Sequence, residues 1–125
     1  MVDAYRYWRR EAIVADIDRR RHRLHIAIEN FENDANIGTV VRTANAFAVH
    51  TVHIVGRRRW NRRGAMVTDR YQHLMHHDST DELLDYAMTV SIAQFGSTRS
   101  INAGVAAGIA MHAWVRQHAD LDGAW

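Results

Sequence analysis

Two short apolar runs of strand length flank one strongly amphipathic segment, and this arrangement constrains the fold of the 125-residue chain more than any other feature. The runs are residues 24–28 and 51–55. Between them, apolar side chains recur at the i, i+3, i+4 and i+7 spacing of a buried helix face: Ile37, Val40, Val41, Ala44, Phe47 and Ala48. Strands that alternate with helices favour a parallel sheet covered on both faces. The sequence therefore predicts a single α/β domain over residues 1–125.

The rest of the chain repeats the alternation. Apolar spacing predicts helices over residues 7–18, 80–87 and 101–117, a short helix over 64–69, and strands over 71–76 and 90–92. The stripe predicted for the first helix is Trp8, Ala12 and Ala15, with Ile13 and Ile17 beside it. Ligands of such folds collect beyond the carboxyl ends of the strands. We therefore expect one functional rim, made by the loops at residues 29–36, 57–63 and 94–100.

Positive charge is concentrated in one of these loops. Five of the 16 basic residues lie there, and the other 11 stand against 14 acidic residues. The five are Arg57, Arg58, Arg59, Arg62 and Arg63. A local patch of this kind indicates an anionic partner that is met at one place.

Several partners are not expected. The chain has no cysteine, which excludes disulfides and thiolate metal sites and is typical of a reducing cytoplasm. No apolar run reaches the roughly 18 residues that span a bilayer, so no membrane partner is predicted. The spacing of His73, His76 and His77 matches no common zinc site, and no metal is predicted.

Two stretches resemble motifs of the SpoU (TrmH-type) RNA methyltransferases of the SPOUT class. The first motif is matched by Ile28-Glu29-Asn30, then by residues 36–44, and by the strand and glycine at 52–56. The third motif is matched by residues 90–92, 96–102 and 105–110. Together they cover roughly half of the chain in the expected order, and the pair is much more specific than a lone glycine motif.

The resemblance implies a C-terminal trefoil knot, S-adenosylmethionine held in that knot, a homodimer, and methylation of a ribose 2′-hydroxyl in transfer or ribosomal RNA. No DNA partner is expected. By position, the resemblance implies catalytic roles for Asn36, Arg42, Ser100 and Asn102. It implies cofactor contacts from Ile92, Gln94, Ser100, Ile101 and Asn102.

Each implied role has a plainer alternative. Arg42 would clamp a phosphate and stabilise a developing alkoxide, because its guanidinium stays protonated; a solvated helix arginine is the alternative. Asn36 would orient the hydroxyl or act only as a helix N-cap. Capping alone is also the alternative for Ser100 and Asn102.

The arginine-rich loop is predicted to dock RNA. Arginines contact phosphates, and Trp60, if exposed, would stack on a base. Arg70 and Tyr71 are expected to extend this surface. A solvated loop or a salt-bridged dimer contact is the alternative.

The family's second motif, a strand leading into a Phe-Gly-x-Glu-x-x-Gly loop, has no counterpart here. Residues 82–90 pass from a helical pattern to a strand pattern without turn residues. We predict that a segment is missing near Ala87 and Met88. The alternative function is accordingly a non-catalytic RNA-binding member of the family that lacks a complete cofactor site, and a base-methylating enzyme is a weaker third possibility.

Overall fold

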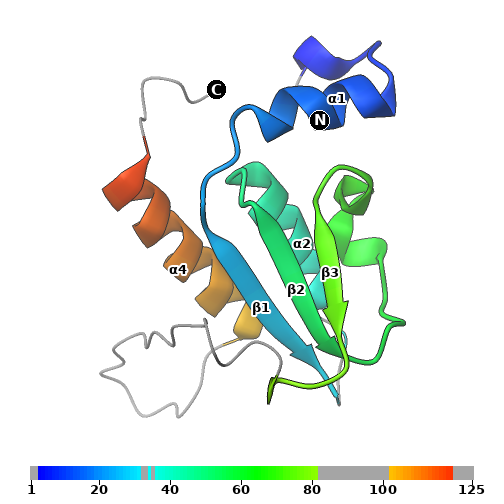
Figure 1. Ribbon diagram of the computed structural model, residues 1–125, viewed down its shortest axis with the longest axis vertical. Helices are drawn as coiled ribbons and strands as arrows, with labels where there is room; N and C mark the ends of the chain where they lie inside the picture. The colour runs from blue at the N-terminus through cyan, green and yellow to red at the C-terminus, as the bar shows by residue number, and fades with distance from the viewer. Residues whose placement is uncertain (1–2, 32–33, 35, 82–101, 120–125) are drawn as a thin grey trace.

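A parallel three-stranded sheet forms the centre of the molecule (Figure 1). The computed structural model describes residues 3–31, 34, 36–81 and 102–119. Strands β1 (His25–Asn30), β2 (Thr51–Gly56) and β3 (Leu74–His77) lie in the order β1-β2-β3. In the register His25 is opposite Thr51, and Val55 is opposite His77. The predicted parallel α/β arrangement is confirmed, with each strand ending one or two residues later than its pattern indicated, except for β2, which ends at the predicted glycine.

Two helices cover one face of this sheet. Helices α2 (Ile37–Ala46) and α4 (Ala103–His118) contact each other; in Figure 1 α2 lies behind the strands and α4 to the left of β1. Helix α1 (Arg10–Asp18) lies at the opposite end of the sheet from the strands' carboxyl ends. Three short 3-10 helices complete the described elements: η1 (Asp3–Tyr5), η2 (Arg63–Ala65) and η3 (Thr68–Arg70). Coverage of both faces, which the alternation predicted, is not seen among the described residues.

The core lies between the sheet and these two helices. Ile37, Val40, Val41 and Ala44 of α2 are all buried, as their spacing predicted. They pack against the sheet through Val52 and Ile54 of β2, and Met111 joins them from α4. Burial of each of the valine, isoleucine and methionine side chains among them stabilises the fold by about 1.5–3 kcal/mol. The predicted face ends earlier than expected, because Phe47 is only half-buried and Ala48 turns away with φ at 53°.

The first helix differs from its prediction. It begins at Arg10, not Tyr7, and Ile13 is its only buried residue. Trp8 is 47% exposed and packs its ring against Tyr5, whose hydroxyl donates a hydrogen bond of 2.6 Å to Asp16. The Trp8, Ala12 and Ala15 stripe was therefore wrong, because Trp8 contacts the preceding turn and both alanines are exposed.

Some predictions fall outside the described residues. These are the strand at 90–92, the loop at 94–100 and most of the helix at 80–87. The last helix is confirmed, running from Ala103 to His118. The knot, the single-domain organisation and the segment missing near 87/88 stay predictions.

Candidate functional site

The N-terminal ends of α2 and α4 lie together at the rim formed by the carboxyl ends of the strands (Figure 1). Gly104 of α4 allows the helices to approach closely, and Gly108 lies opposite α2 one turn later. A Cβ at Gly104 would lie 3.2 Å from Thr39 Cγ2, and one at Gly108 would lie 3.9 Å from Thr43 Cγ2. Gly104 faces Thr39, and four residues later in both helices Gly108 faces Thr43. The two helices therefore run in the same direction. Their first turns therefore open onto the same rim.

The asparagines before the two helices behave differently. Asn102 caps α4, and its Oδ1 accepts hydrogen bonds from Gly104 N at 2.8 Å and Val105 N at 3.2 Å. Asn36 precedes α2 but makes no side-chain capping hydrogen bond. The Asn102 side chain therefore acts as a helix cap, as its plainer alternative predicted. The Asn36 side chain does not.

Arg42 lies on the exposed side of α2, away from the core. It is six residues after Asn36, about 9 Å along the helix axis at 1.5 Å per residue. No hydrogen bond or ion pair joins its guanidinium to the part of the chain that the structure describes. Within the described residues, its guanidinium is thus exposed and makes no contact that fixes it.

The arginine-rich loop is anchored beside the start of α2. Asn61 N donates a hydrogen bond of 2.8 Å to Asp34 Oδ2, in the loop between β1 and α2. A Cβ at Gly38 would lie only 2.7 Å from Ala65 N, so η2 packs closely against the first turn of α2. All five arginines of the loop are exposed. This brings a dense positive surface next to Asn36.

Trp60 does not lie where the sequence suggested. It is only 8% exposed and belongs to the hydrophobic core, with the Arg62 guanidinium carbon 4.4 Å from its ring centroid. Arg62 is held there by an ion pair of 3.0 Å with Asp69. An exposed tryptophan that stacks on a base was therefore a wrong expectation, because the core covers one side of the ring and Arg62 the other.

A small hollow of about 260 Å³ lies beside this tryptophan. Its polar lining residues are Arg58, Arg62 and His76, and Met75 is among the apolar ones. Arg70, the predicted extension of the surface, is also exposed, and its carbonyl accepts a hydrogen bond of 3.0 Å from Arg10 Nε. Two of the exposed arginines, Arg58 and Arg62, thus line this hollow.

Each of the three histidines considered for zinc contacts a different partner. His73 pairs with Asp18 at 2.7 Å, His76 hydrogen-bonds the carbonyl of Gly56, and His77 lies 2.8 Å from His53. Among the described residues no three metal-binding side chains are arranged so that they could hold a metal ion.

A histidine row that the sequence analysis missed crosses the sheet face opposite α2. His25 Nδ1 lies 2.8 Å from His53 Nε2, and His53 Nδ1 lies 2.8 Å from His77 Nε2. Burial lowers the pKa of His53 and of His25, and neighbouring histidines lower both further. One histidine comes from each strand, so only the strand register could have revealed the row.

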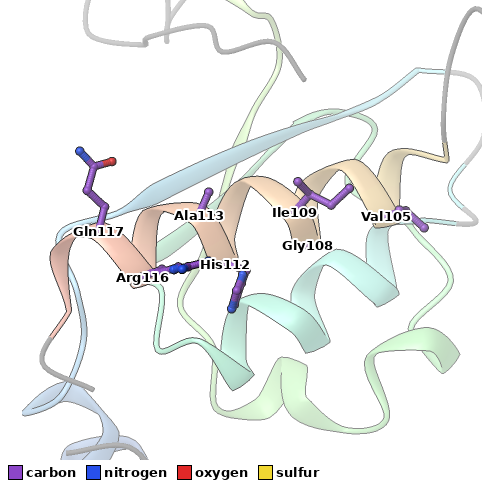
Figure 2. A pocket seen from close by; sticks show the side chains of 7 residues that line it. All are labelled: Val105, Gly108, Ile109, His112, Ala113, Arg116 and Gln117. Atoms are coloured by element: carbon purple, nitrogen blue, oxygen red, sulfur yellow. The ribbon is translucent and has the colours of Figure 1, made fainter. Parts of the chain in front are cut away.

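The outer side of α4 carries a wide, shallow hollow of about 800 Å³ (Figure 2). Val105 and Ile109 are exposed there at 56% and 46%. His112 and Arg116 line the same hollow further along the helix. This surface lies apart from the arginine-rich loop.

Four of the predicted cofactor contacts, Ile92, Gln94, Ser100 and Ile101, lie outside the described residues, so Asn102 alone of that set has a described position. In the described parts of the chain no helix is long and apolar enough to cross a membrane.

Comparison with known proteins agrees with this arrangement. The profile of the SpoU rRNA Methylase family matches residues 23–88, which include Asn36, Arg42 and the arginine-rich loop. The structure is similar to that of a TrmH/SpoU tRNA modifying enzyme from A. aeolicus, with a TM-score of 0.69 and 15% identity over 86% of this chain and 81% of that one. No curated protein matches the chain. The fold is shared with that enzyme, and since the family profile covers more than half of the sequence, the chain belongs to the SpoU rRNA methylase family.

Proposed function

We propose that the protein is an S-adenosylmethionine-dependent RNA methyltransferase that acts on a ribose 2′-hydroxyl of transfer or ribosomal RNA. The observation that carries this proposal is the meeting of α2, α4 and the arginine-rich loop at one rim, within the region matched by the family profile. An exposed guanidinium, an amide that makes no capping hydrogen bond and a dense positive surface are groups suited to positioning a phosphodiester.

Arg42 and Asn36 carry the chemistry in this proposal. Arg42 holds the phosphate next to the target sugar and stabilises the negative charge that grows on the attacking oxygen, because it stays protonated. Asn36 orients the hydroxyl with an amide that no capping bond occupies.

The cofactor would be held by Ile92, Gln94, Ser100, Ile101 and Asn102. When bound, S-adenosylmethionine supplies an electrophilic methyl group. Asn102 fits such a role, because its Oδ1 caps α4 and the orientation of its amide is thereby fixed, which leaves Nδ2 as a donor.

The remaining expectations from the resemblance are part of the same proposal: a C-terminal trefoil knot, a homodimer and a cytoplasmic location. The exposed apolar residues Val105 and Ile109 on α4 favour that side as the surface for a second copy.

The test is methyl transfer from labelled S-adenosylmethionine to unmodified transfer RNA or ribosomal RNA. After digestion to nucleosides, the label is expected on ribose. Arg42→Gln should lower kcat about 100-fold or more, as loss of one charge-stabilising donor does elsewhere. Arg9→Gln, which removes an exposed arginine next to α1 at the opposite end of the sheet from the rim, is the matched control. Label on a base would overturn the ribose assignment, and equal rates for both variants would remove Arg42 from the reaction.

A second candidate follows from the missing second motif. Residues 82–90 contain no Phe-Gly-x-Glu-x-x-Gly sequence, so the chain could bind RNA without completing a cofactor pocket. Calorimetric titration with S-adenosylmethionine distinguishes the two, because an RNA-binding member without that pocket produces no heat of binding.

A further inference from the structure

The carboxyl end of β1 is tied to the arginine-rich loop by one side chain, that of Asn30. Its Nδ2 donates hydrogen bonds to the carbonyl oxygens of Arg57 at 2.7 Å and Arg59 at 2.9 Å. Its own carbonyl oxygen accepts a hydrogen bond of 3.0 Å from Arg57 N. Asn30 is completely buried, whereas the three arginines at 57–59 are exposed.

The chain is shaped to make this contact possible. Gly56 turns beneath Asn30 with φ at 114°, a conformation that glycine adopts without strain. A Cβ there would lie 2.6 Å from the Asn30 carbonyl oxygen. The loop therefore leaves β2 in close contact with Asn30, and Arg58 stands between the two carbonyls that Asn30 holds.

Not every polar atom of this asparagine is satisfied. Its Oδ1 is buried and accepts no hydrogen bond from the residues that the structure describes. A buried acceptor without a partner destabilises a fold, because it has given up its hydrogen bonds to water. What the side chain does achieve is to fix the backbone on both sides of Arg58, in a segment whose five like charges would otherwise repel one another.

We propose that Asn30 is a positioning residue for RNA: it fixes the backbone at 57–59 so that Arg58 and its neighbours present their guanidinium groups to the phosphates in one arrangement. This inference rests on the proposed RNA-binding function. A fixed loop loses less conformational freedom on binding than a mobile one, and binding is correspondingly tighter. Asn30 acts through the arginines and does not contact the reacting atoms.

The experiment measures binding of an unmodified transfer-RNA transcript at several salt concentrations. Asn30→Ala should weaken binding about tenfold and lower the slope of log K against log salt by about 0.7–0.9 for each phosphate that the loop no longer neutralises. In methylation assays KM for RNA should rise while kcat stays within twofold. Asn45→Ala is the matched control, since Asn45 also has a buried, unpartnered Oδ1 but lies at the far end of α2.

A double-mutant cycle separates positioning from a general loss of stability. Arg58→Gln should weaken RNA binding several-fold in the wild-type background and by less than twofold in the Asn30→Ala background, because an unfixed loop no longer uses Arg58. Should Asn30→Ala fold poorly, Asn30→Ser, which keeps a smaller hydrogen-bond donor, serves for the same cycle. Additive effects, or an unchanged salt slope in a folded Asn30 variant, would overturn the positioning role. Absence of RNA binding by the wild-type protein would instead overturn the proposed function itself.

Discussion

Trp60 is the residue whose surroundings differ most from what its sequence context indicated. Three arginines before it and two after it suggested an exposed ring, yet it is buried in the core beneath Arg62. Trp60→Ala should therefore lower the free energy of unfolding by about 3–5 kcal/mol, the range for removing a buried aromatic side chain. Denaturant unfolding measures it, with Trp8→Ala as the control, because Trp8 is 47% exposed. A base-stacking residue would show the reverse pattern: weaker RNA binding and unchanged stability.

The environment of a single residue could be predicted from the sequence when its partners are close to it along the chain. The buried positions of α2 followed from spacing, because neighbours on one helix face share one environment. The role of Asn30 could not be predicted, since its partners lie 27 and 29 residues away and only the folded sheet brings them together. Arg42 and Asn36 were found through motif resemblance: Asn36 lies at the start of α2 and Arg42 on its exposed side, and their roles stay predictions.

At the scale of elements, the close approach of α2 to its neighbours depends on glycines. A Cβ at Gly38 would lie 2.7 Å from the backbone nitrogen of Ala65, whereas one at Gly108 would meet only Thr43 Cγ2, at 3.9 Å. Gly38→Ala should therefore lower the free energy of unfolding by about 1–3 kcal/mol, as overpacking does. Gly108→Ala should raise it by up to about 1 kcal/mol, because alanine favours the helix. Thermal unfolding of the two variants checks this, and equal shifts would contradict the packing of η2 on α2.

Element boundaries were less predictable than element types. The strand expected over 71–76 begins only at Leu74, because the preceding residues are used elsewhere. Arg21, whose side chain is 3% exposed, donates a hydrogen bond of 2.6 Å to the carbonyl of Tyr71, and the side chain of Gln72 donates to Val49 O. These are contacts between distant segments, which local spacing does not encode. The strongly periodic helix α2 was located closely, since its pattern leaves little ambiguity, and α4 was located to within two residues at its start.

For the whole molecule, the row of histidines joins all three strands on one face of the sheet. Two contacts of 2.8 Å between ring nitrogens link His25, His53 and His77. A neutral row, or a row with one extra proton, can keep an N–H donor and a nitrogen acceptor at both contacts. A second extra proton cannot be added without setting two N–H groups, or two acceptors, against each other. The sheet should therefore be sensitive to acid.

The direction of this pH dependence follows from the pKa values. Burial, reinforced by neighbouring histidines, lowers the pKa of His53 and of His25 below 6.5 in the folded protein. The unfolded chain then binds more protons, so stability rises with pH. This contribution is fully present above pH 6.5 and is lost as the pH falls from 6.5 toward the lowered values in the fold. Denaturant unfolding at a series of pH values should show the decrease, and it should be smaller in His53→Gln than in His112→Gln, a histidine exposed on α4. If both variants keep the wild-type slope between pH 7.5 and 5, the histidine row does not control the acid stability of the sheet.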